Sequence, residues 1–291
     1  MSASERRFWL WDGRLVPEAE VRLSPWDRGF RYGDGLYETL RVHRGRPFRL
    51  GEHLARMREG LALLELDLDP GAAFPRPDLL ELIAASGLGA GEGRLRLFVT
   101  RGPDRGPALP PARVSPTRLA MVEPLAPGAP ASDPRPLRLA AVTAMAPRPA
   151  AWASLKSLNH LPYVLAAAAA ARAGADDALL VYQGKVKETT SANLFVVRDG
   201  AVLTPPLGEG ILAGVTRDLV LALARAVAGE AREEAIPFAD LARAEEAFAT
   251  GSVAGVRPVA VVDGRPLGAA APGPVTRRLQ LAYAGALAAE D

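Results

Sequence analysis

The chain contains no cysteine, so it can form no disulfide, no thiolate metal site and no cysteine nucleophile. It also lacks a long hydrophobic run. The longest, at 161–171, ends at Arg172 and is too short to cross a bilayer. Residues 1–7 are polar and charged and do not resemble a signal peptide. These absences predict a cytoplasmic protein that does not enter membranes.

The sequence also lacks a large excess of charge of one sign. The 291 residues carry 35 basic and 33 acidic side chains, for a net charge of +2. The arginines form no dense cluster with interleaved aromatic residues, so a nucleic-acid partner is not expected. The three histidines, at positions 43, 53 and 160, are too widely spaced to predict a metal site. The 49% hydrophobic content is enough for a substantial core in one large or two ordinary domains.

Proline marks the clearest break in the chain. Residues 123–136 contain five prolines, a density that excludes a helix or a central strand and is typical of a linker. We therefore expect an N-terminal domain over 1–122 and a C-terminal domain over 137–291.

Hydrophobic periodicity and turn residues predict the elements of the N-terminal part. Strands at 8–11 and 14–16 flank an Asp-Gly turn, and helices are expected over 52–66 and 78–86. Residues 94–100 alternate as a strand that places Leu95, Leu97 and Val99 on one face. The glycine-rich stretch at 33–38 is expected to lead into a strand at 39–43.

The C-terminal part mixes strands and helices in the same way. We expect strands at 137–143, 178–182, 193–197, 201–204 and 248–250, and helices at 162–174, 217–228 and 275–288. Because the order does not alternate strictly between strand and helix, the predicted fold class is α+β.

Lysine is rare, with three copies against thirty-two arginines, and Lys156 lies within an apolar run. Arginine stays charged, whereas a buried lysine can act as a neutral amine and form a Schiff base. A structural, paired Lys156 is an equally weighted alternative. Lys185 and Lys187 flank a turn at Gly184 and are expected to be solvated charges of a hairpin.

Glu188 follows Lys156 by thirty-two residues, and the predicted helix and hairpin between them could bring both to one site. A carboxylate beside a pyridine nitrogen keeps that nitrogen protonated and makes the ring an electron sink. Taken alone, without Lys156, Glu188 is better interpreted as a surface charge on a strand.

Two glycine-containing segments could bind an anion. Gly214, Val215 and Thr216 open a predicted helix, where free backbone N–H groups can cradle a phosphate, although an ordinary N-cap is an alternative. Residues 251–253 follow a predicted strand and could supply further donors. Arg56, on the helix at 52–66, could reach a phosphate or simply be solvated.

Together these segments resemble fold type IV enzymes that use pyridoxal 5′-phosphate, also called class IV aminotransferases. Six motifs occur in the order typical of that family: RGFRYGDGLYE (28–38), EHLARM (52–57), KSLN (156–159), ETTSANLF (188–195), GVTRD (214–218) and TGS (250–252). The resemblance covers nearly the whole chain. It implies two α+β domains with the site between them, and a homodimer whose partner chain completes the substrate pocket.

The resemblance also implies a role for individual residues. Lys156 would form the internal aldimine with pyridoxal phosphate and move a proton between the substrate Cα and the cofactor C4′. Glu188 would pair with the pyridine nitrogen, and Leu212 would pack against the ring. The remaining cofactor-binding residues would be Arg56, Asn193, Gly214, Val215, Thr216 and Ser252. The substrate would be contacted by Tyr37, Arg96, Arg105 and Val253, and no metal is implied.

Within the family, the motifs favour the branch of D-amino-acid aminotransferases and aminodeoxychorismate lyases. The D-amino-acid enzymes usually carry an Arg-x-His sequence after Thr-Arg-Gly, whereas this chain has Arg105 followed by Gly106 and no such histidine. The turn at 104–106 is closer to the lyases, while Tyr37 and Glu38 favour the aminotransferases. Arg96 and Arg105 are the candidates for binding a substrate carboxylate.

Three functions therefore remain. The first is an aminotransferase that moves an amino group between an amino acid, or a related primary amine, and a 2-oxo acid. The second is 4-amino-4-deoxychorismate lyase, which releases pyruvate and leaves 4-aminobenzoate. The third is a non-catalytic sensor that binds pyridoxal phosphate or another metabolite.

Overall fold

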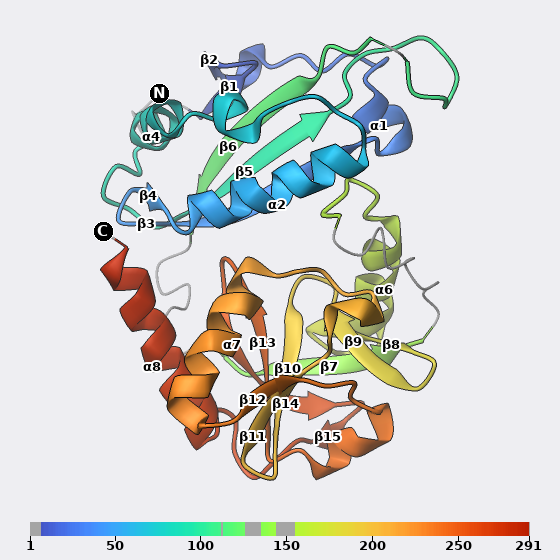
Figure 1. The fold of residues 1–291 in the computed structure, drawn as a ribbon, viewed down its shortest axis with the longest axis vertical. Helices are drawn as coiled ribbons and strands as arrows, with labels where there is room; N and C mark the ends of the chain where they lie inside the picture. The colour runs from blue at the N-terminus through green and yellow to red at the C-terminus, as the bar shows by residue number, and fades with distance from the viewer. Residues whose placement is uncertain (1–6, 112, 126–134, 144–154, 291) are drawn as a thin grey trace. The chain divides into compact units, whose positions relative to one another are not determined.

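The structure is a computed structural model that describes residues 7–111, 113–125, 135–143 and 155–290. Its contacts divide the chain into two units (Figure 1). Among the described residues, the first unit holds 7–125 together with Leu155–Asn159, and the second holds 135–143 and 160–290. Most of the predicted linker, at 126–134, lies outside the described residues, so the domain boundaries stay a prediction.

The first unit is built on an antiparallel sheet with the strand order β2-β1-β6-β5-β3-β4. Its strands are β1 (Phe8–Trp11), β2 (Arg14–Pro17), β3 (Gly35–His43), β4 (Arg46–Pro47), β5 (Gly93–Thr100) and β6 (Thr117–Pro124). Its helices are α1 (Arg28–Tyr32), α2 (Leu50–Leu63), α3 (Pro70–Ala73) and α4 (Arg76–Ala85), with a 3-10 turn at Glu18–Glu20.

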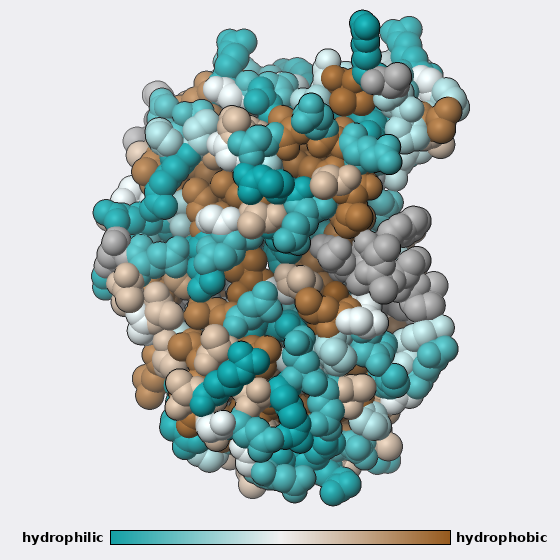
Figure 2. Space-filling model, viewed as in Figure 1, coloured by the Kyte–Doolittle hydropathy of each residue, from teal (hydrophilic) through white to brown (hydrophobic). Residues whose placement is uncertain are grey.

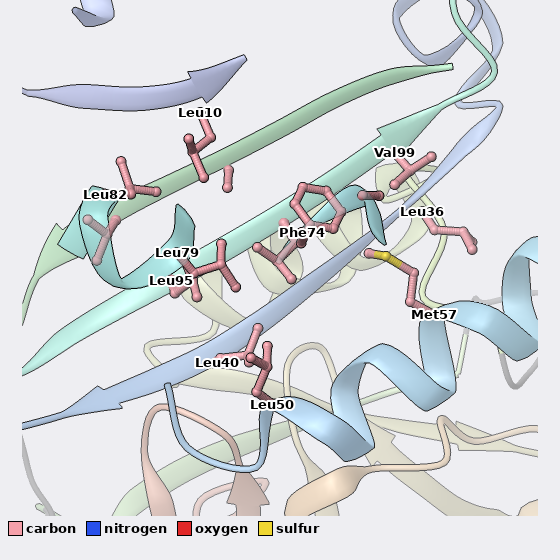
Figure 3. Close-up of a cluster of buried hydrophobic side chains, with 14 of the residues drawn as sticks. Leu10, Leu36, Leu40, Leu50, Met57, Phe74, Leu79, Leu82, Leu95 and Val99 are labelled. Atoms are coloured by element: carbon pink, nitrogen blue, oxygen red, sulfur yellow. The ribbon is translucent and has the colours of Figure 1, made fainter. Parts of the chain in front are cut away.

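The core of this unit lies between one face of the sheet and helices α2 and α4 (Figure 3). Leu95 and Val99 of β5 point to this face, as the alternation along the strand predicts. Met57 of α2 and Leu79 of α4 pack against them in the same buried cluster. The opposite face of the sheet therefore receives the alternate residues of each strand.

The second unit contains a larger mixed sheet. Its strands are β7 (Leu137–Val142), β8 (Asp177–Tyr182), β9 (Lys185–Thr189), β10 (Asn193–Arg198), β11 (Ala201–Thr204), β12 (Ala231–Glu233), β13 (Glu246–Gly251), β14 (Gly255–Val262) and β15 (Arg265–Pro266). Its helices are α6 (Leu161–Arg172), α7 (Val215–Ala228) and α8 (Pro274–Ala289), with 3-10 turns at Leu207–Glu209 and Phe238–Arg243.

The strands of this sheet close into a barrel. Along the order β12-β11-β10-β13-β14-β7-β8-β9, the last strand pairs back to β10 through Asn193 and Glu188. Strands β7 and β8 are parallel, and α6 packs on them through Tyr163, Ala166 and Ala170. The barrel is thus closed at the residue pair that includes the predicted cofactor-binding carboxylate.

Most of the predicted elements are confirmed, with ends shifted by a few residues. The short helix α1 was not predicted. Its N-cap Asp27 is fully buried and accepts a hydrogen bond from the Gly29 N–H, as well as from the hydroxyls of Thr100 and Thr117. The prediction that Lys187 is solvated is wrong, because its side chain is only 12% exposed and pairs with Glu209.

On the face of the molecule in view, hydrophilic and hydrophobic residues are interspersed (Figure 2). Within the described ranges, no helix combines the length and hydrophobicity needed to span a membrane. The same residues contain no group of acidic or histidine side chains arranged to hold a metal ion.

Candidate active site

The segment that carries Lys156 is anchored to the first unit by backbone hydrogen bonds. The N–H of Tyr37 donates to the Lys156 carbonyl over 2.9 Å, and the N–H of Leu158 donates to the Gly35 carbonyl over 3.1 Å. Ser157 forms an antiparallel bridge with Leu36. This segment extends the edge of β3 and groups with the first unit.

A glycine allows this segment to approach α1. Gly33 ends α1 with a φ of 66°, a left-handed conformation that favours glycine. The Asn159 side chain donates to the Gly33 carbonyl over 3.1 Å, and a Cβ on Gly33 would come within 2.4 Å of Asn159 Oδ1. The KSLN motif is therefore held at both of its ends.

The Lys156 side chain lies over an aromatic ring. Its Nζ is 4.5 Å from the centroid of the Tyr37 ring, which is cation–π geometry. Tyr37 itself stacks on Phe98 of β5, with 6.2 Å between the ring centroids. The structure thus brings two of the predicted site residues, Tyr37 and Lys156, together.

Behind Tyr37, a buried ionic cluster links β3 to α2. Arg56 donates from Nε to Glu38 Oε1 over 2.8 Å and from Nη2 to Glu38 Oε2 over 2.6 Å. His53 Nδ1 lies 2.6 Å from Glu38 Oε2. His53 and Arg56 are three residues apart, so they share one face of α2. The predicted phosphate ligand Arg56 is therefore held in place by a carboxylate.

The charges within this cluster are set by burial and by pairing. Burial acts to raise the pKa of Glu38, but the Arg56 charge and the hydrogen bonds from His53 and Arg56 outweigh it and lower the pKa to about 2. Burial lowers the pKa of His53, and the charges of Arg56 and Lys156 act in the same direction. The cluster therefore holds an ionised Glu38 against Arg56 and favours a neutral His53 at neutral pH.

The two arginines predicted to bind substrate carboxylate have different surroundings. Arg96 lies on β5 opposite Thr39, and within the described residues its guanidinium is neither hydrogen-bonded nor ion-paired. Arg94, two residues earlier on the same face, pairs with Glu123 over 2.9 Å. Arg105 is exposed and lies 5.1 Å from the centroid of the Trp26 ring.

Arg28 fixes the loop that carries Arg105. Its side chain is almost completely buried and donates to Asp34, to the carbonyl of Pro107 over 2.8 Å and to that of Ala108 over 2.5 Å. Arg31 adds a hydrogen bond to the carbonyl of Asp104 over 2.9 Å. The arginines of the RGFR motif therefore position this loop.

In the second unit, the centre of the candidate site is the carboxylate of Glu188. It is buried near the end of β9, so the alternative of a surface charge is wrong. Its Oε1 accepts from the Tyr163 hydroxyl over 3.1 Å, and its Oε2 accepts from the Leu212 N–H over 3.0 Å. Asn193 Nδ2 lies 3.3 Å from Oε2.

Asn193 joins this carboxylate to the start of α7. Its Nδ2 also donates to the Leu212 carbonyl over 2.9 Å. A Cβ on Gly214 would lie only 2.1 Å from Asn193 Oδ1, so a larger residue here would displace the Asn193 side chain. The structure thus gathers four predicted cofactor-binding residues: Glu188, Asn193, Leu212 and Gly214.

The N-terminus of α7 has the chemistry of an anion site. Gly214 is its N-cap and provides no side-chain hydrogen bond, so the first N–H groups of this 14-residue helix, on Val215 and Thr216, are not capped by a side chain there. Ser252 and Val253 lie in the turn between β13 and β14. A buried carboxylate and a helix N-terminus in one unit fit a cofactor with a pyridine nitrogen and a phosphate.

Three residues of these clusters were not recognised from the sequence. Glu38 and His53 were named without a role, although the spacing of His53 and Arg56 on one helix was a usable signal. Tyr163 was not singled out because nothing in the sequence connects it with Glu188, which lies on a different element.

The chain is similar to known proteins of one family. The family model described as amino-transferase class IV matches residues 35–262. A D-alanine aminotransferase of Bacillus licheniformis is 33% identical over 283 residues, covering 97% of each chain. A putative branched-chain-amino-acid aminotransferase of Methanocaldococcus jannaschii is 34% identical over 272 residues, covering 92% of each chain.

Solved structures share the fold over nearly the full length. The branched-chain aminotransferase of Thermoproteus uzoniensis, solved with norvaline, has a TM-score of 0.87 and 26% identity, covering 98% of this chain and 96% of its own. The 4-amino-4-deoxychorismate lyase of Pseudomonas aeruginosa has a TM-score of 0.80 and 35% identity, covering 94% and 97%. A PLP-bound hypothetical aminotransferase of Mycobacterium tuberculosis has a TM-score of 0.81 and 25% identity, covering 98% and 100%.

The Glu38 cluster predicts a specific dependence of stability on pH. The pKa of Glu38 is about 2 in the folded chain against 4.5 for the free group, so its ionisation stabilises the fold above pH 4.5. This stabilisation is lost as the pH falls from 4.5 towards 2. Between pH 5 and pH 3, the loss of stabilisation amounts to about 2 kcal/mol.

The unfolding free energy of the wild type should fall between pH 5 and pH 3. We expect that of Glu38→Gln to fall by about 2 kcal/mol less over the same range. Urea unfolding at both pH values measures this difference. Glu59→Gln, on the exposed side of α2, is the control and should follow the wild type. An identical pH dependence for Glu38→Gln and the wild type would contradict the assignment.

Proposed function

This chain belongs to the class IV aminotransferase family, and from that premise we propose that it moves an amino group between an amino acid, or a related primary amine, and a 2-oxo acid. The cofactor is pyridoxal 5′-phosphate. The observation that carries the proposal is the buried Glu188 carboxylate, hydrogen-bonded from separate elements beside the start of α7.

Residues of the second unit supply what the ring and the phosphate need. When bound, the cofactor provides a protonated pyridine ring that draws electrons from the substrate Cα. Glu188 would pair with the ring nitrogen, and Leu212 would pack against the ring. Val215 and Thr216 would donate their N–H groups to the phosphate, and Ser252 would add a further donor. The arrangement around Gly214 supports these roles because it leaves the start of α7 without a side-chain cap.

Lys156 would supply the primary amine that holds the cofactor, and its Nζ would take up and return the proton at the substrate Cα. Its position over the Tyr37 ring supports this role, because the backbone pairing with β3 holds the lysine in place. Arg56 would donate to the phosphate, and its bidentate pairing with Glu38 fixes the orientation of its guanidinium.

The substrate contacts involve Tyr37, Arg96, Arg105 and Val253. Arg96 is the stronger candidate for the substrate carboxylate, since its neighbour Arg94 is neutralised by Glu123 while Arg96 has no such partner in the described part of the chain. Arg105 is the alternative, presented on a loop that Arg28 holds.

Lys156→Ala is expected to lower the transamination rate by at least about a thousandfold, because the amine that forms the Schiff base and carries the proton is lost. The measurement is keto acid formation from a panel of L- and D-amino acids with 2-oxoglutarate as acceptor. Lys185→Ala is the control, since Lys185 pairs with Glu209 over 2.7 Å and has no proposed role. Turnover by Lys156→Ala near the wild-type rate would refute the proposed mechanism.

Arg96→Leu is expected to raise the KM for the 2-oxo acid by roughly 10- to 100-fold, the range for losing a charge-assisted hydrogen bond, with a smaller change in kcat. Arg94→Leu removes a charge from the same face and should leave the KM within about threefold of the wild type. If Arg105→Leu raises the KM and Arg96→Leu does not, the carboxylate is bound by Arg105 instead.

A second candidate, 4-amino-4-deoxychorismate lyase, is favoured by the 35% identity with the enzyme of Pseudomonas aeruginosa. The same lysine chemistry would then release pyruvate and leave 4-aminobenzoate. Pyruvate formation from aminodeoxychorismate without an amino acceptor would support the lyase, and no formation at high enzyme concentration would exclude it. If bound cofactor responds to neither amino donors nor aminodeoxychorismate, the chain is a sensor.

We also propose that the chain acts as a homodimer in the cytoplasm. Helix α6 leaves Leu161, Val164 and Leu165 more than half exposed, and such clustered apolar side chains are typical of a surface that contacts another protein. Sedimentation equilibrium tests this, with a dimer mass expected and a monomer mass at micromolar concentration contradicting it.

A further inference from the structure

Tyr163 forms an unexpected contact with the carboxylate at the centre of the site. It lies on α6, is 7% exposed, and donates its hydroxyl to Glu188 Oε1 over 3.1 Å. Its ring lies 5.3 Å from that of His160, one helical turn earlier. The hydroxyl is therefore presented by a ring that the helix and its neighbours hold in place.

Two further donors to Glu188 act on the opposite oxygen. The Leu212 N–H and Asn193 Nδ2 both lie near Oε2, whereas Tyr163 contacts Oε1. Asn193 also donates a hydrogen bond to the Leu212 carbonyl, so these two residues hold each other in place beside Oε2 of the carboxylate. The Tyr163 hydroxyl comes from a different element and supports the other side.

Hydrogen bonds to a carboxylate favour its ionised form and lower its affinity for a proton. This matters where a carboxylate shares a proton with a pyridine nitrogen, because the proton stays on whichever atom binds it more strongly. A hydrogen bond donated to Oε1 lowers the affinity of the carboxylate for that proton. The nitrogen then keeps the proton, and the pair remains ionic.

We propose that Tyr163 is a positioning residue that keeps Glu188 ionised and thereby keeps the cofactor nitrogen protonated. This rests on the proposed function, in which Glu188 faces that nitrogen. Without the hydroxyl, the shared proton moves from the nitrogen towards Glu188 Oε, leaving a neutral ring and a neutral carboxylic acid. Tyr163 touches neither substrate nor cofactor in this role and acts through Glu188.

The test is the nitrogen-15 NMR shift of ring-labelled pyridoxal phosphate bound to Tyr163→Phe, which keeps the ring and removes only the hydroxyl. The shift should move from the wild-type value towards that of neutral pyridine, and kcat should fall about tenfold with little change in KM. Tyr182→Phe is the matched control, because its hydroxyl belongs to the same unit and accepts a hydrogen bond from Gln183. It should leave both quantities unchanged.

Glu188→Gln separates this inference from the proposed function. It should bring the nitrogen-15 shift to the neutral end of the range. If it leaves the shift at the wild-type value, the role of Glu188 itself is wrong. If Glu188→Gln moves the shift and Tyr163→Phe does not, only the inference about Tyr163 is overturned.

A second variant guards against loss of folding. Tyr163→4-aminophenylalanine retains a polar group of similar size, but the amino group is a weaker hydrogen-bond donor than the Tyr163 hydroxyl. It should move the nitrogen-15 shift in the same direction as Tyr163→Phe, by a smaller amount. An unchanged shift in this variant would overturn the proposal even if Tyr163→Phe failed to fold.

Discussion

A buried carboxylate must be surrounded by hydrogen-bond donors, and much of the second unit's architecture serves this requirement at Glu188. Strand β9 supplies the carboxylate, while α6, β10 and the loop before α7 supply Tyr163, Asn193 and Leu212. Glu188 and Asn193 are also the backbone pair that closes the barrel. The closure of the sheet and the assembly of the site therefore depend on the same residues.

In the first unit, a buried carboxylate, Glu38, is stabilised by charged and hydrogen-bonding partners. Glu38 is enclosed between β3 and α2, and Arg56 and His53 of α2 satisfy both of its oxygens. This ties the helix that carries the predicted phosphate ligand to the strand that carries Tyr37. Lys156 is positioned from the same strand, through the hydrogen bonds of its segment to Tyr37 and Gly35. Strand β3 thus positions the two residues of the first unit with the central proposed roles, Lys156 and Arg56.

Local signals were enough to predict most elements of the fold and several site residues. The alternation of Leu95, Leu97 and Val99, the Asp-Gly turn after β1 and the glycine before α7 each report on their immediate surroundings. The scarcity of lysine in the sequence indicated Lys156 as a candidate site residue. Long-range contacts leave no such trace, so the link from Tyr163 to Glu188 and the packing of Lys156 with the first unit were not foreseen. Lys187 was misjudged for the same reason, since its partner Glu209 lies on a distant turn.

We propose that the chain transfers an amino group from an amino acid to a 2-oxo acid. The most direct test mixes the protein, loaded with pyridoxal phosphate, with one amino donor and no 2-oxo acid, and quantifies the keto acid released. We expect one keto acid per active site and no further release until a 2-oxo acid is added. No release with any L- or D-amino acid, together with continuous pyruvate release from aminodeoxychorismate, would contradict it.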